Sequence, residues 1–109
     1  MNPFTYIDQI DALTPEIPPD SIVSRTIVSE PGVRVILFGF AAGQELSEHT
    51  AARPALIHVL RGSATLTAGG QPHEAGPGAM LVMQPNLPHS VVAREEVVLL
   101  LYLYSNPPD

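Results

Sequence analysis

Histidine and carboxylate side chains are the main sources of chemistry in this 109-residue chain. The sequence contains no cysteine, and all five of its basic residues are arginines, so thiolate nucleophiles, zinc–thiolate sites and lysine Schiff bases are excluded. Histidine can act as a general acid or base near neutral pH, and it can also bind metal ions. The first candidates for a functional site are therefore the four histidines: His49, His58, His73 and His89.

Two of these histidines, His49 and His89, stand in segments with regularly placed glycines. The first segment runs from Gly43 through His49 to Gly62, and the second runs from Gly78 to His89. The two imidazoles could form an acid–base pair or share a metal ion, provided that the fold brings the segments together. Their chemistry therefore depends on the elements that carry them.

The chain around these segments consists of short apolar or alternating runs separated by glycine and proline. β-branched and aromatic residues dominate the runs, and no window keeps a helical apolar period over about twelve residues. We therefore expect an all-β fold, and a closed or two-sheet barrel would leave few strand edges exposed. The expected strands are 21–29, 34–41, 55–61, 63–68, 79–84, 89–94 and 97–104.

The first twenty residues contain too many prolines for a long helix, so we expect an extended arm with one short turn within 7–13. The chain is long enough for one core but not for two. We therefore expect a single domain, in which 1–32 form the arm and the first strand, 33–104 form the barrel and 105–109 form a tail.

Two segments that contain expected strands, 33–41 and 97–104, are apolar on both faces. One face of each strand should line the barrel interior, and the other must be covered by the N-terminal arm or by a second subunit. The apolar outer faces and the proline-rich arm therefore predict a homodimer.

In their order and spacing, the two glycine-bounded segments resemble the motifs of the cupins, which are small double-stranded β-helix or jelly-roll barrels. The first cupin motif is a glycine, five residues, His-x-His, three or four residues, a glutamate, six residues and a glycine. Here Gly43, His49 and Gly62 keep that frame, but alanine stands at the second histidine and at the glutamate. The segment from Gly78 to His89 resembles the second motif in its Pro-Asn-x-Pro-His form. The resemblance covers roughly 33–104 and implies a jelly-roll (cupin) barrel.

The resemblance also implies a divalent metal site of three histidines and a carboxylate, of which this chain supplies His49 and His89. Ala51 and Ala55 stand where the other two ligands are expected. Two imidazoles and water would hold Fe, Mn, Ni or Zn weakly or not at all unless another residue helps. His58 has the wrong parity to face the interior on a regular strand. Three side chains could supply a further ligand: His58, Glu45 and Glu48.

The barrel interior is also expected to bind a small molecule. Alanine at positions 51 and 55 enlarges the cavity and lowers its charge, which favours an apolar or neutral ligand over a tightly held ion. Interior methionine and aromatic side chains would line the pocket, and an arginine at the barrel mouth could hold an anionic group. The residues expected to contact the ligand are His49, Ala51, Ala55, His89, Arg53 and Met83.

Charge and hydropathy narrow the class of function. A net charge of -6 argues against nucleic acid as a partner. No apolar run approaches the length of about 18 residues that spans a membrane, and no secretory signal pattern is present, so a cytoplasmic location is expected. Three functions stay open: a cupin that binds a small, largely apolar molecule beside a degenerate metal site, a metal-dependent oxygenase, decarboxylase or isomerase, and a non-catalytic sensor or structural dimer. Enzyme activity is left undecided.

Overall fold

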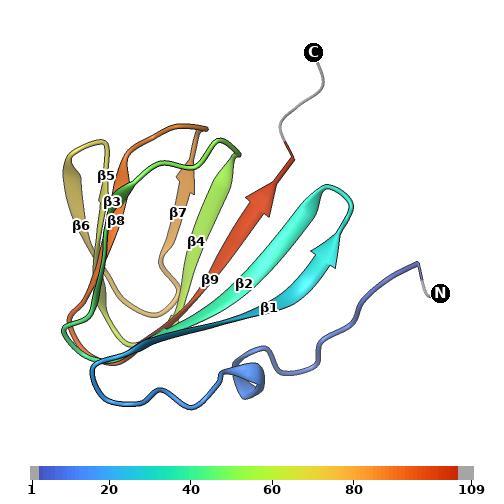
Figure 1. Cartoon of the computed structure of the whole chain (residues 1–109), viewed down its shortest axis with the longest axis horizontal. Coiled ribbons are helices and arrows are strands. Elements are labelled where there is room, and N and C mark those ends of the chain that lie inside the picture. Colours follow the sequence, from blue (N-terminus) through green and yellow to red (C-terminus); the bar gives the residue numbers. More distant parts are fainter. Residues whose placement is uncertain (1–2, 106–109) are drawn as a thin grey trace.

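The computed structural model describes residues 3–105, which form nine β-strands in two facing sheets (Figure 1). The strands are β1 (Ile22–Glu30), β2 (Val33–Phe40), β3 (Glu45–His49), β4 (Ala55–Arg61), β5 (Ala64–Ala68), β6 (Gln71–Ala75), β7 (Met80–Met83), β8 (His89–Ala93) and β9 (Val97–Tyr104). This architecture confirms the all-β jelly-roll barrel. No helix in the described part of the chain is long and apolar enough to cross a membrane.

The strand order brings distant parts of the sequence together. The five-stranded sheet has the order β1-β2-β9-β4-β7, and the four-stranded sheet has the order β3-β8-β5-β6. All of these pairings are antiparallel. As a result β3 and β8, which carry the two motif histidines, lie side by side in the four-stranded sheet, opposite the inner face of the five-stranded sheet.

The core lies between the two sheets and follows the alternation of side chains along each strand. On β4, Ala55, Ile57 and Val59 are buried, and the residues between them are only half-buried. The buried set packs against Leu66 and Val91 of the opposite sheet. On β4 the alternation of burial therefore separates an inner face from an outer face.

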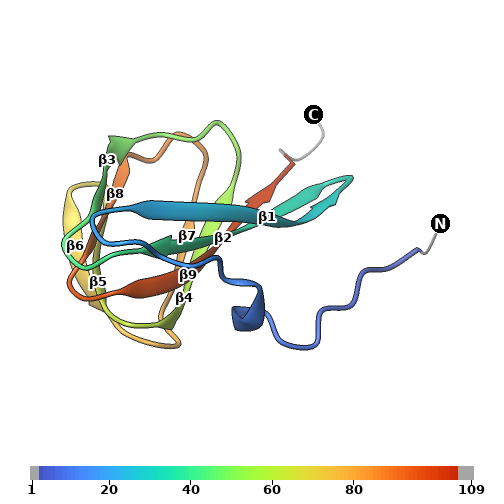
Figure 2. The ribbon, with the colours of Figure 1, turned by 60° about the horizontal axis from the view of Figure 1, so that its bottom comes forward.

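A second apolar cluster lies on the outer face of the five-stranded sheet. Leu37 and Leu100 are buried there, although they point away from the barrel interior. Ile10 and Ile17 of the N-terminal arm pack against this cluster, and the arm contains one short 3-10 helix, η1 (Asp11–Leu13). Figure 2 shows the arm passing beside the sheet. The arm thus supplies the cover that was expected for the outer faces of β2 and β9.

Seven strands agree with the expected runs to within one residue at each end. Two strands, β3 and β6, are absent from the expected set. β3 is polar and mostly exposed, so its sequence lacks the apolar alternation of a half-buried strand. β6 contains Pro72, which a strand tolerates at a sheet edge, and β6 is the edge strand of its sheet. Of the expected tail only Ser105 lies within the described residues, and the first two residues of the expected arm also lie outside them.

Candidate functional site

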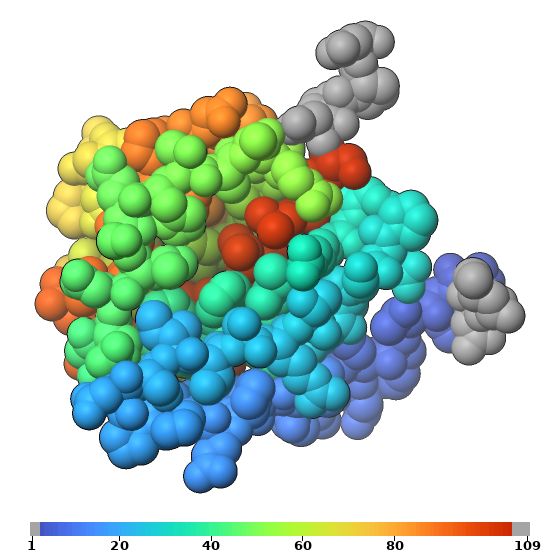
Figure 3. All heavy atoms as spheres, in the orientation of Figure 1, coloured from blue at the N-terminus to red at the C-terminus, as the bar shows by residue number. Residues whose placement is uncertain are grey.

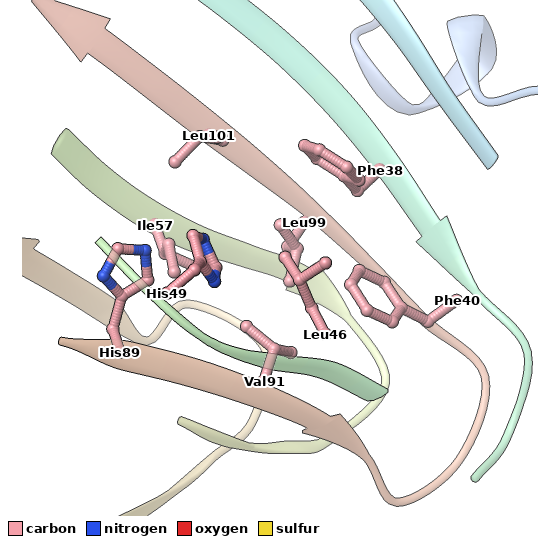
Figure 4. Close-up of a pocket in the computed structure, with 9 residues that line it drawn as sticks. All are labelled: Phe38, Phe40, Leu46, His49, Ile57, His89, Val91, Leu99 and Leu101. Carbon is pink, nitrogen blue, oxygen red and sulfur yellow. The ribbon is translucent and has the colours of Figure 1, made fainter. Parts of the chain in front are cut away.

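The structure brings His49 and His89 together as direct register partners of the β3–β8 pairing. Their ring centroids are 4.1 Å apart and their ring planes make an angle of 61°. Figure 4 shows the two rings next to each other at one end of a set of apolar side chains. His89 is only 5% exposed, whereas His49 is an exposed residue. The pair therefore extends from the buried core to the solvent-exposed surface.

A β-bulge in β3 turns His49 toward the interior. Leu46 pairs with Val91 and His49 pairs with His89, so three steps along β3 correspond to two steps along β8. On a regular strand Leu46 and His49 would face opposite sides of the sheet, because side chains alternate. The extra residue of the bulge places both of them on the inner face, and both line the same cleft.

Backbone carbonyls fix the protonation pattern of both neutral imidazoles. Nδ1 of His49 lies 2.9 Å from the carbonyl oxygen of Ser47, and Nδ1 of His89 lies 2.8 Å from that of Leu87. A carbonyl oxygen only accepts, so each neutral ring carries its hydrogen on Nδ1 and has an acceptor at Nε2. Across residues 3–105, no fully buried side-chain nitrogen or oxygen lacks a partner. Since only Nδ1 of His89 has a hydrogen-bond partner there, its Nε2 atom is not fully buried.

The cleft beside the pair is almost entirely apolar. Its enclosed volume is about 30 Å³, and the free space including the open mouth is about 310 Å³. Figure 3 shows residues of β9, in red, visible between the green segment that contains β3 and β4 and the teal strand β2. The aromatic rings of Phe38 and Phe40 lie 6.1 Å apart between centroids. The lining side chains are Phe38, Phe40, Leu46, His49, Ile57, His89, Val91, Leu99 and Leu101.

The three further metal ligands considered from the sequence do not join the histidine pair. His58 pairs with Met80 and Leu100 on the outer face of the five-stranded sheet, as its parity indicates. Glu45 and Glu48 are exposed and directly precede the inward-facing residues of β3, so the alternation of side chains directs them outward. Among residues 3–105 no group of three or more histidine, cysteine, aspartate or glutamate side chains could hold a metal ion.

Four of the expected ligand contacts lie outside the cleft lining. Arg53 donates from Nε to the carbonyl oxygen of Tyr104 at 2.9 Å, so its guanidinium ties the loop before β4 to the end of β9. Ala55 and Met83 pair with each other in the buried interior. β3 ends at His49, so strand parity no longer determines where Ala51 points.

Five lining residues were missed by the sequence interpretation: Leu46, Ile57, Val91, Leu99 and Leu101. Inward parity is the signal that would have selected Ile57, Leu99 and Leu101. For Leu46 that signal fails, because its inward orientation together with His49 requires the bulge.

The sequence was also compared with protein-family models. The model of the cupin domain matches residues 36–104. The chain belongs to the cupin family. No curated protein matches its sequence.

Solved structures share this cupin fold over nearly the whole chain. A conserved protein of unknown function from Streptococcus pyogenes is 25% identical over 98% of this chain and 100% of its own, with a TM-score of 0.78. A cupin superfamily protein from Desulfitobacterium hafniense DCB-2 is 21% identical over 89% of this chain and 88% of its own, with a TM-score of 0.82. A cupin 2 conserved barrel domain protein from Leptotrichia buccalis is 27% identical over 91% of this chain but only 47% of its own, with a TM-score of 0.77.

The donor set of this cupin does not fit a metal centre of three or four protein ligands. A catalytic metal site usually has three protein ligands and a structural one has four. The histidine pair supplies two nitrogens, and small hydrocarbon side chains stand at the other two motif positions, Ala51 and Ala55. No chemical step is therefore assigned to a metal ion.

Proposed function

We propose that this cupin binds a small, largely apolar molecule in the cleft between its two sheets, with His49 and His89 as the polar contacts. The observation that carries the proposal is the composition of the cleft, in which hydrocarbon side chains surround two adjacent imidazoles. Ligand sites commonly combine an apolar lining with a few polar groups that orient the ligand. A divalent ion would find two imidazoles there, so we expect it to bind weakly or not at all.

Filling the cleft tests this proposal. Val91 lines the cleft, whereas Val92, the next residue of β8, does not, and side chains alternate along a strand. We expect Val91→Phe to abolish the binding of neutral single-ring compounds in isothermal titration, and Val92→Phe to retain it. Val91→Met is the milder variant if the larger ring prevents folding, and it should weaken binding. Equal affinity in the wild type and in a folded Val91 variant would contradict the proposal.

We also propose that the protein is a homodimer. The arm leaves part of the outer face of the five-stranded sheet bare, and we call Leu56, His58, Met80 and Val82 the uncovered face. Met80 and Val82 are 59% and 70% exposed and pair in register with His58 and Leu56. Two copies related by a two-fold axis would present this same apolar surface to each other.

The uncovered face borders other groups that a partner would bury further. Tyr102 is the register partner of Leu56, and its ring stacks with that of Tyr104 at 6.3 Å. Burial, together with the nearby Tyr104, raises the pKa of Tyr102 above its ordinary value. Phe4 and Tyr6 of the arm are large exposed side chains that add apolar area to the same molecule. Both the five-stranded sheet and the N-terminal arm thus offer apolar surface for contact with a second copy.

Sedimentation velocity at micromolar concentration tests the dimer. The wild type should sediment as a dimer, and Val82→Glu should shift it to a monomer, because the change places a charge within the apolar contact. His73→Glu on the edge strand β6 adds the same side chain to the other sheet and should leave the dimer intact. A monomeric wild type would contradict this proposal.

A further inference from the structure

The cleft presents hydrogen-bond acceptors to its ligand. In each neutral imidazole Nδ1–H faces a backbone carbonyl, so Nε2 remains as the acceptor. The other seven lining side chains are hydrocarbon and can neither donate nor accept. A ligand that brings a hydrogen-bond donor to Nε2 would therefore satisfy the polar group that the protein itself leaves without a protein partner.

The ligand that carries this hydrogen-bond donor should be uncharged. The lining contains no arginine, aspartate or glutamate. Arg53, the candidate for anion binding from the sequence, lies outside the lining, where its Nε donates to the carbonyl oxygen of Tyr104, and Glu45 and Glu48 are exposed on β3. A carboxylate would thus find no permanent cation in the cleft and an ammonium group would find no anion. Burial of such an unpaired charge is costly.

The enclosed part of the cleft is narrow and admits only a small group of a ligand, so a ring attached to that group must lie at the open mouth. The enclosed part of the cleft has a volume of about 30 Å³, whereas a closed apolar cavity that accommodates benzene has about 150 Å³. The rest of the free space, about 310 Å³ in all, includes the open mouth. Phe38 and Phe40 lie on β2, on the wall formed by the five-stranded sheet, and Figure 4 places them away from the histidine pair. A ring could contact these apolar side chains while a substituent reaches the imidazoles.

From these properties we propose that the ligand is a neutral single-ring molecule bearing a hydroxyl group, which donates its hydrogen to Nε2 of His89. His89 is the main acceptor because it is the buried member of the pair, where a hydrogen bond competes less with water. The exposed ring of His49 bounds the hydroxyl site at the solvent side. This inference rests on the proposed function and adds the chemical class of the ligand.

Isothermal titration with phenol and anisole tests the inference, because anisole keeps the ring and the oxygen but lacks the O–H donor. We expect the wild type to bind phenol about tenfold more tightly than anisole, the effect of one hydrogen bond in a desolvated site. His89→Phe should remove the preference by removing the acceptor. His58→Phe, on the outer face, should retain it. Benzoate should bind more weakly than phenol.

The outcomes separate the two proposals. Equal binding of phenol and anisole by the wild type would overturn the hydroxyl inference and leave the apolar ligand site standing. Binding of neither compound would overturn both. If His89→Phe does not fold, imidazole ¹⁵N shifts in the wild type decide the question. Phenol should then move the Nε2 resonance of His89 and anisole should not, and the same response to both compounds would contradict the inference.

Discussion

The two ends of the barrel differ in the groups that determine their structure and in the role that we assign to them. At one end, backbone contacts close the fold: the amide of Gly43 donates to the carbonyl oxygen of Ala93 at 2.9 Å, and Gly62 packs against Glu96. At the other end, His49 and His89 face an open cleft through their side chains. The glycine end depends on backbone geometry, whereas the histidine end depends on which side chains are present. This difference explains how the cupin frame persists here beside two alanines at motif ligand positions.

The glycine end should be the more sensitive of the two to small changes. Gly62 has φ +81°, and a Cβ atom there would overlap the carbonyl oxygen of Glu96 and lie 2.8 Å from Cα of Val97. Both neighbours are backbone atoms, so neither can rotate away. We expect Gly62→Ala to lower the free energy of unfolding by about 3 kcal/mol or more, from steric overlap and backbone strain combined. Urea unfolding measures this loss.

Gly70 is the matched control for that variant. Its φ is +79°, but a Cβ atom there would meet nothing within 4 Å. Gly70→Ala should therefore cost only the backbone strain, about 1 kcal/mol. If the two variants were equally stable, the close approach of Glu96 would not be what fixes Gly62.

At the histidine end, restoring one motif ligand should convert the cleft into a metal-binding site. Ala55 lies one inward position from Ile57 on β4 and is buried. Ala55→Glu should lower the free energy of unfolding by about 2 kcal/mol without metal, because it buries an unpaired carboxylate. Added Zn²⁺ should raise the melting temperature of this variant more than that of the wild type, because two imidazoles and a carboxylate are then available.

Leu56→Glu provides the control on the same strand, since Leu56 belongs to the outer face. It places the same carboxylate outside the barrel and should gain no stabilisation from Zn²⁺. An equal response of both variants to Zn²⁺ would show that the ion acts elsewhere.

The smallest effect is expected at Arg53. Its Nε donates one hydrogen bond to the carbonyl oxygen of Tyr104, so Arg53→Gln should reduce the free energy of unfolding by about 1 kcal/mol. The affinity for a neutral ring compound should not change, because Arg53 is outside the cleft lining. A clear loss of affinity in titration calorimetry would indicate that Arg53 contacts the ligand after all.

The glycine end was largely predictable from sequence, and the histidine end was predictable only in part. Turn residues and short apolar runs give β4 and β9 with their observed bounds, because these signals are local. The motif spacing also selects His49 and His89. The bulge between Leu46 and His49 has no local signal, since it exists only when β3 pairs with β8. The apolar lining on the β3 side therefore became visible only in the folded chain.

Methyl chemical-shift mapping tests the central claim most directly, because it locates the ligand without assuming its site. With leucine, isoleucine and valine methyls labelled, phenol should shift the resonances of Leu46, Ile57 and Leu99, which line the cleft. Leu60 and Val82, which lie outside the lining, should not respond. Shifts confined to the uncovered face, with the cleft methyls unchanged, would contradict the assignment of the cleft as the ligand site.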